Sequence, residues 1–142
     1  MRRRSRLYLD ASALVKTVVA EPESSALRAV IARADVAASE LVLAEVPRAL
    51  ARLRFEEDGQ RHGVGSQAAR VLAGLDLVEV TRPLLASAGR LAPPRLRTLD
   101  AVHVASALAL GDSLDAFVTY DRRQRSAAAA GGLAVLSPGA TA

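Results

Sequence analysis

Short apolar runs that alternate with helical patterns constrain the fold of this chain more than any other sequence feature. Strands that alternate with helices favour a parallel sheet covered by helices on both faces. We therefore predict an α/β fold in a single domain over residues 1–142. The predicted strands are Leu7–Leu9, Val36–Ala38, Leu77–Val80, Ala116–Tyr120 and Leu133–Leu136.

The segments between these strands carry helical patterns with recognisable ends. Ser12 is expected to cap the first helix, and Thr98 to cap a strongly apolar one. Pro47 lies inside the longest pattern, so that helix either begins late enough to hold the proline near its first turn or kinks there. The glycine-rich segment Asp58–Ser66 is predicted to be a loop. The predicted helices are Ala13–Ala20, Ser25–Ala34, Ser39 or a neighbour to Glu57, Gln67–Leu75, Pro83 to about Leu91, Leu99 to about Leu110, and a short one through Ala130.

Composition limits the kinds of site that the chain can build. Cysteine is absent, which excludes a disulfide framework and a thiolate metal site or nucleophile. The net charge is +4, and 18 of the 19 basic residues are arginines, which suit bidentate contacts with phosphate. The same Ala- and Arg-rich composition also fits a bias of the source genome. With two Phe, two Tyr and no Trp, any nucleic acid would be held mainly by charge and metal rather than by stacking.

Targeting and membrane-spanning segments are not expected in this sequence. The N-terminus is basic, but Asp10 interrupts the apolar run that follows, too early for a signal peptide. No run of about 18 apolar residues occurs. We therefore expect a soluble, cytoplasmic protein with no membrane partner.

Four acidic residues lie where an α/β fold places its functional sites. Asp10 and Asp121 follow predicted strands, and the binding crevice of an open α/β sheet lies outside the carboxyl ends of its strands. Glu45 lies on the long helix, and Asp100 lies in the first turn of an apolar helix. A charge beside apolar segments is costly unless something compensates it, and hard oxygen ligands favour Mg²⁺ or Mn²⁺. Each acid also has a structural alternative, as a helix cap, a dipole partner or a solvated helix residue.

Motifs around these acids carry a family resemblance. The motifs occur in series and are Tyr8–Ala13 (YLDASA), Leu43–Val46 (LAEV), Leu99–Ala107 (LDAVHVASA) and Val118–Asp121 (VTYD). With them the chain resembles the PIN-domain ribonucleases, and among these the VapC-type toxins of bacterial toxin–antitoxin pairs. The resemblance implies a three-layer α/β/α sandwich with a five-stranded parallel sheet, in which the first strand is central and the fourth lies beside it.

The resemblance also implies a site and a reaction. The reaction is metal-dependent hydrolysis of an RNA phosphodiester with Mg²⁺ or Mn²⁺, which would orient and deprotonate a water and neutralise charge on the leaving oxygen. The target, whether transfer, ribosomal or messenger RNA, stays open. The implied catalytic and metal-binding acids are Asp10, Glu45, Asp100 and Asp121, the supporting hydroxyls are Ser12 and Thr119, and the candidates for binding flanking phosphates are Arg97, Arg122 and Arg123.

Two residues depart from the family's pattern. Pro47 follows Glu45 closely and could shift its carboxylate, whereas Gln124 stands where the family more often has an apolar residue. Glu40 is the alternative to Glu45, because five residues amount to about 140° of helix rotation and both cannot point into one site. His103, one turn after Asp100, either faces the site or packs between helices, and packing is the favoured interpretation. His62 in the glycine-rich loop has no evident partner.

Apolar helix surface points to a protein partner. The long helix and the helix before it carry more aliphatic surface than one face of a small sheet covers, which predicts a groove for an amphipathic segment. The resemblance implies a cognate antitoxin in that groove and a homodimer elsewhere. The residues concerned are Val46, Leu50 and Leu53 on one helix and Leu27, Val30 and Ile31 on the other.

Other functions fit the sequence less well. Phosphotransfer domains need a second acid close to the first and a lysine late in the chain, but Ser12 occupies the nearby position and Lys16 is the only lysine. Dinucleotide binding would need a G-x-G-x-x-G turn after the first strand, and none is present. A catalytically inactive PIN-like module that binds a basic peptide or RNA remains the alternative.

Overall fold

The central sheet has the predicted strand order. A computed structural model describes residues 3–56 and 63–141 of the chain. All the strands run parallel in the order β3-β2-β1-β4-β5, so the first strand is central and the fourth lies beside it, as predicted. The strands are β1 (Ser5–Leu9), β2 (Ala34–Ser39), β3 (Asp76–Val78), β4 (Ala116–Val118) and β5 (Val135–Leu136).

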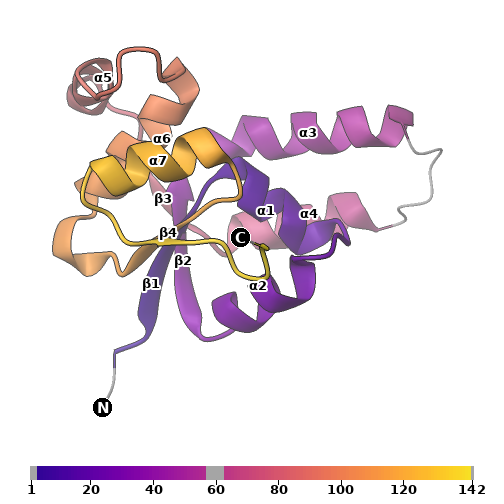
Figure 1. Ribbon diagram of the computed structural model, residues 1–142. Coiled ribbons are helices and arrows are strands. Elements are labelled where there is room, and N and C mark those ends of the chain that lie inside the picture. Colours follow the sequence, from indigo (N-terminus) through magenta and orange to yellow (C-terminus); the bar gives the residue numbers. More distant parts are fainter. Residues whose placement is uncertain (1–2, 57–62, 142) are drawn as a thin grey trace.

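Helices connect the strands as the alternating pattern predicted. Residues 57–62, which include His62 and most of the predicted glycine-rich loop, lie outside the described part of the chain, and α4 already begins at Val64 instead of Gln67. Within residues 3–56 and 63–141, no helix is long and apolar enough to cross a membrane. The helices are α1 (Ala11–Val18), α2 (Ser24–Ile31), α3 (Val42–Glu56), α4 (Val64–Ala73), α5 (Arg82–Gly89), α6 (Thr98–Ala109), the 3-10 turn η1 (Gly111–Ser113) and α7 (Arg122–Ala130). Figure 1 shows α1, α2 and α4 together on one side of the sheet.

Alternation along β1 divides the core between the two faces of the sheet. Leu7 and Leu9 point into an aliphatic cluster under α1 to α4, and each buried leucine contributes about 1.5–3 kcal/mol. Tyr8 points to the opposite face, where it packs under α6 and α7. Its ring stacks on Phe117 of the neighbouring strand, with ring centroids 4.9 Å apart. Helix α5 packs mainly on α6 and closes the second layer.

Two predicted helix caps are wrong by a few residues. Asp10, not Ser12, is the N-cap of α1, and its carboxylate accepts a hydrogen bond from the Ala13 N–H. Ser12 therefore lies inside the helix. Thr98 is the first residue of α6, and its N-cap is Arg97, which makes no capping hydrogen bond. The cap of α1 is thus the acid at the end of β1.

Pro47 lies inside α3, beyond its first turn. Because α3 begins at Val42, the alternative that the helix begins late enough to place the proline near its start is wrong. Proline has no N–H, so one bond of the helix ladder, to the carbonyl four residues earlier, is missing. The helix still runs to Glu56, and its inner residues Val46 and Leu50 are buried in the aliphatic core.

Candidate active site

The predicted acids follow the carboxyl ends of the central strands or begin the helices beside them. Asp10 is the residue after β1, and Asp121 caps α7 just after β4, which pairs with β1. Glu45 lies in the first turn of α3, the helix that follows β2. Asp100 lies in the first turn of α6, which packs against β2. Adjacent parallel strands end at one edge of a sheet, so the fold concentrates acidic side chains there.

Asp10 is buried and fully hydrogen-bonded. Its side chain is only 4% exposed. One oxygen, Oδ1, accepts hydrogen bonds from the Ser12 hydroxyl at 2.7 Å and from the Ala13 N–H at 3.0 Å, and Oδ2 accepts one from the Thr119 hydroxyl at 2.5 Å. Burial raises the pKa of Asp10 above its usual value, and these hydrogen bonds only partly oppose the shift. Among the described residues, the Asp10 carboxylate thus receives hydrogen bonds but forms no ion pair.

Asp121 and Asp100 share an arginine. The Arg97 Nε lies 3.3 Å from Asp100 Oδ2, and its Nη2 lies 4.0 Å from Asp121 Oδ2. Asp121 also caps α7 through the Arg123 and Gln124 N–H groups, so its structural alternative is realised too. Its own N–H donates to the Thr119 hydroxyl, which links it to Asp10.

Glu45 is held by a buried histidine. The Nε2 of His103 lies 2.7 Å from Glu45 Oε1, and the other ring nitrogen, Nδ1, lies 2.6 Å from the Tyr8 hydroxyl. The Tyr8 oxygen also accepts a hydrogen bond from the Ser39 N–H, at 3.2 Å. Residues from β1, β2, α3 and α6 thus meet in one continuous row of contacts.

The carboxylates do not form a compact cluster. In the part of the chain that the structure describes, no three His, Cys, Asp or Glu side chains stand close enough together to hold a metal ion. Each acid instead has a protein partner: hydroxyls and an amide for Asp10, His103 for Glu45, and Arg97 for Asp100 and Asp121. The oxygen-only donor set still fits a hard divalent cation, as does buried Asp10, which forms no ion pair in the described part of the chain.

A protein-family model matches most of the chain. The family model described as the PIN domain matches residues 7–130 of the chain. The chain belongs to the PIN-domain family. The match includes all four candidate acids, Asp10, Glu45, Asp100 and Asp121.

Relatives place this PIN domain among the VapC ribonucleases. Ribonuclease VapC46 of Mycobacterium tuberculosis is 47% identical over 133 residues, which cover 93% of this chain and 97% of that protein. Ribonuclease VapC47 of the same species is 37% identical over 139 residues, with 94% and 98% covered. Both alignments span nearly the full length of both proteins, which supports a VapC-type PIN domain throughout.

Solved structures agree with the PIN fold. The crystal structure of Mycobacterium tuberculosis VapC20, described as a toxin that cleaves the sarcin–ricin loop, has a TM-score of 0.69 at 18% identity and covers 93% of this chain and 99% of that one. VapBC2 from Rickettsia felis, solved with a DNA fragment from its promoter, has a TM-score of 0.64 at 16% identity, with 92% and 97% covered. At these identities the likeness shows the fold, and it bears out the predicted three-layer sandwich.

The structure adds detail to the sequence-based interpretation of three further residues. His103 is buried at 2% exposure, in line with the packing interpretation, and its ring also contacts Glu45. The sequence signal for that contact is its place one turn after Asp100. Glu40 does not replace Glu45, because its Oε1 accepts the Val80 N–H at 2.7 Å and joins the connection after β3. Gln124 is buried at 1% exposure, and within the described residues its side-chain oxygen has no hydrogen-bond partner.

Arginines surround a cleft beside the acids. Arg122 and Arg123 on α7 and Arg95 in the segment before α6 line a cleft of about 720 Å³, with Pro93 and Leu96 as apolar neighbours. All three arginine side chains are exposed. Arg97, two residues after Arg95 in the sequence, contacts Asp100 and Asp121. Positive charge therefore borders the acidic edge of the sheet.

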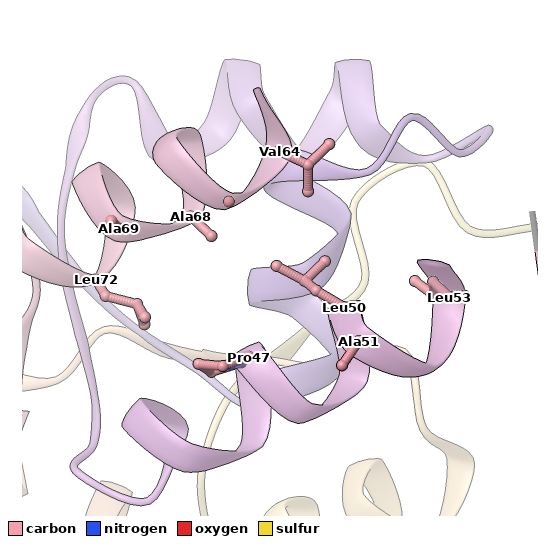
Figure 2. A pocket seen from close by; sticks show the side chains of 9 residues that line it. Pro47, Leu50, Ala51, Leu53, Val64, Ala68, Ala69 and Leu72 are labelled. Atoms are coloured by element: carbon pink, nitrogen blue, oxygen red, sulfur yellow. The ribbon is translucent and has the colours of Figure 1, made fainter. Parts of the chain in front are cut away.

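A second, apolar pocket lies between α3 and α4 (Figure 2). It measures about 240 Å³. Leu50 and Leu53 line it as predicted from the sequence, but its other wall is α4 and not α2, because Leu27 is completely buried in the core. Figure 2 shows side chains of the two helices facing each other across the pocket. The lining residues are Pro47, Leu50, Ala51 and Leu53 from α3 and Val64, Gly65, Ala68, Ala69 and Leu72 from α4.

Proposed function

We propose that this chain is a divalent-metal-dependent endoribonuclease and the toxin of a toxin–antitoxin pair. The observation that carries the proposal is Asp10, a buried carboxylate that forms no ion pair within the described residues, at the carboxyl edge of a VapC-type PIN domain. Burying such a charge costs free energy unless something compensates it. A divalent cation bound here would supply that compensation.

The proposed site uses the acids in a common role as oxygen ligands. Asp10, Asp100 and Asp121, together with Glu45, would hold Mg²⁺ or Mn²⁺. When bound, such an ion activates a water for in-line attack on the phosphodiester and stabilises charge on the leaving oxygen. Ser12 and Thr119 keep the Asp10 carboxylate oriented through the hydrogen bonds described above.

Nearby arginines would hold the RNA strand. Acidic side chains repel RNA, so substrate binding needs positive charge next to the acids. Arg122 and Arg123 border the 720 Å³ cleft, and Arg97 contacts Asp100 and Asp121. We propose that these arginines contact the phosphates that flank the cleaved bond.

Incubation with RNA tests the proposal directly. Purified protein should cut single-stranded and structured RNA when Mg²⁺ or Mn²⁺ is present, and EDTA should stop the reaction. RNA binding without cleavage in either metal would instead support the alternative, an inactive PIN-like module. Mapping the 5′ ends produced in cells that express the chain would then identify the target RNA.

The apolar pocket between α3 and α4 is our candidate for the antitoxin's docking site. Pro47, Leu50 and Leu53 offer aliphatic contacts spaced along α3, which suit an amphipathic helix laid into the groove. The solved VapBC2 from Rickettsia felis, bound to a DNA fragment from its promoter, supports the expectation of an antitoxin partner. A homodimer through another surface completes the proposed assembly.

A matched pair of variants on α4 tests this docking site. Ala69 is exposed and lines the pocket, whereas Ala73 is exposed on the same helix outside it. Ala69→Arg should fill the pocket and reduce co-purification with the antitoxin encoded beside the toxin, without reducing RNA cleavage by the free protein. Ala73→Arg should leave co-purification unchanged. Equal co-purification of both variants would place the antitoxin elsewhere.

A further inference from the structure

The contacts of His103 have a defined direction. A carboxylate accepts hydrogen bonds and cannot donate them, so the 2.7 Å contact between Glu45 Oε1 and His103 Nε2 requires a proton on Nε2. In the neutral imidazole the other nitrogen, Nδ1, is then an acceptor. The Tyr8 hydroxyl lies 2.6 Å from Nδ1 and can donate to it.

The hydrogen bond between Ser39 and Tyr8 is consistent with this direction. The Ser39 N–H donates to the Tyr8 oxygen, which leaves the phenolic proton free to point at Nδ1. Burial raises the pKa of Tyr8 well above its usual value, so the phenol keeps its proton. Donors and acceptors can therefore be paired from Ser39 through Tyr8 and His103 to Glu45, and the Ser106 hydroxyl is a further hydrogen-bond neighbour of Tyr8.

Position in the fold separates this histidine from an ordinary packing residue. His103 is 2% exposed, and Tyr8 and Ser39 are completely buried, so solvent does not compete for their hydrogen bonds. Val104, the next residue of α6, fills the core with an aliphatic side chain alone. His103 reaches from the core to the candidate site acid Glu45 across 58 residues of sequence, on the helix that contains Pro47.

We propose that His103 is a positioning residue, which holds the Glu45 carboxylate in the active site through Nε2 and is itself oriented by Tyr8. The proposal rests on the proposed function of this edge of the sheet. In this arrangement Pro47 does not displace Glu45, because the side chain is anchored from the opposite helix. His103 contacts neither metal nor RNA, and its effect on both passes through Glu45.

Two substitutions of His103 separate its two contacts. The side-chain amide of Gln places its nitrogen near the position of Nε2, whereas that of Asn places it near Nδ1. His103→Gln therefore keeps a donor for Glu45 and should recover most of the wild-type affinity for Mn²⁺. His103→Asn loses that donor and should bind Mn²⁺ about 10- to 100-fold more weakly, the usual effect of removing a group that orients a metal ligand. Equal Mn²⁺ affinities for wild type and His103→Asn would overturn the proposal.

A double-variant cycle shows whether the effect passes through Glu45. In a Glu45→Ala background, His103→Asn should cause no further loss of Mn²⁺ affinity, because the group that it positions is already gone. Additive losses would overturn the proposal. Val104→Ala serves as the structural control: it should lower the melting temperature by loosening the core under α6, but leave Mn²⁺ affinity unchanged.

Nuclear magnetic resonance tests the same point without metal or RNA. Long-range ¹H–¹⁵N spectra should show the His103 tautomer with a proton on Nε2 in the wild type, and Tyr8→Phe should disturb it. A proton on Nδ1 with a bare Nε2 would contradict the inference. If His103 has the expected tautomer but the wild type binds no Mn²⁺ and cuts no RNA, the proposed function fails while the arrangement of His103 stands.

Discussion

The two pairs of acids at the edge of the sheet are anchored in different ways. Asp10 and Glu45 receive their hydrogen bonds from groups fixed in the core, namely Thr119, the α1 backbone and His103. Asp100 and Asp121 share Arg97, whose side chain is 65% exposed. One pair is therefore held by buried groups of the fold. In the other pair a single surface arginine contacts both acids, and Asp121 also caps α7.

The two pairs should therefore respond differently to a bound cation. The core-anchored pair is held by buried groups, but within the described residues Asp10 forms no ion pair, and burial raises its pKa. The arginine-anchored pair is already compensated, by exposed ion pairs of the kind that contribute about 0–1 kcal/mol. A divalent cation would add charge where it is missing in the first pair and would displace Arg97 from the second.

Removing one acid from either pair should have the largest effect. Asp10→Asn and Asp100→Asn should each reduce RNA cleavage by more than about 100-fold, because even residues that only orient metal ligands typically contribute 10- to 100-fold. Circular dichroism should show an unchanged fold. Asp35→Asn is the control, since Asp35 is exposed and pairs with Arg4 away from the site. Wild-type cleavage rates in either site variant would rule out the shared mechanism.

Without metal, neutralising one acid of each pair should change the melting temperature differently. Burial raises the pKa of Asp10 in the folded state, so this group stabilises the fold at low pH, and that contribution is lost as pH rises through its folded pKa. In EDTA at neutral pH, Asp10→Asn should therefore raise the melting temperature by a few degrees, and asparagine keeps the cap of α1. Asp100→Asn should change it little, because Arg97 already compensates Asp100.

Magnesium should reverse this order. Mg²⁺ binds the folded state, so it should stabilise the wild type more than either variant. Melting curves recorded in EDTA and then in Mg²⁺ would measure both effects. A lower melting temperature for Asp10→Asn in EDTA, with equal Mg²⁺ shifts for all three proteins, would mean that Asp10 is only a helix cap.

Arg97 should give the smallest effect, with opposite signs for metal and RNA. Without its guanidinium, Asp100 and Asp121 should attract a cation more strongly, so Arg97→Gln should tighten Mn²⁺ binding by about fivefold at most. The same change should weaken binding of RNA by the cleavage-deficient Asp10→Asn protein. Arg90→Gln, on the exposed C-cap of α5, is the matched control. Weaker Mn²⁺ binding by Arg97→Gln would show that the arginine supports the cation site instead of competing for it.

Features that depend on local sequence could be predicted. The strands and their acids, such as Asp10 after β1, follow from apolar runs that end at a charge, and the family's motifs supply the strand order. The link between His103 and Glu45 was not predicted, because it depends on how α3 and α6 pack across a separation of 58 residues. The pocket wall formed by α4 in place of α2 has the same origin.

The N-cap of α1 and the contacts of Arg97 differ from their predictions for local reasons. Ser12 and Asp10 compete for the N-cap of α1, and both residue types are good caps. Asp10 takes the cap because β1 ends directly before it, which places its carboxylate over the first turn of the helix. Arg97 was predicted only as a phosphate ligand, and its contacts with two acids depend on the path of the segment before α6.

Titration of the protein with Mn²⁺ in the absence of RNA tests whether the acids form a cation site built on Asp10. Calorimetry on wild type, Asp10→Asn and the control Asp35→Asn would compare metal affinity without relying on cleavage. If the acids form a cation site, wild type and Asp35→Asn should bind Mn²⁺ alike and Asp10→Asn should bind it at least about 100-fold more weakly. Equal affinities for all three proteins would contradict a metal site built on Asp10.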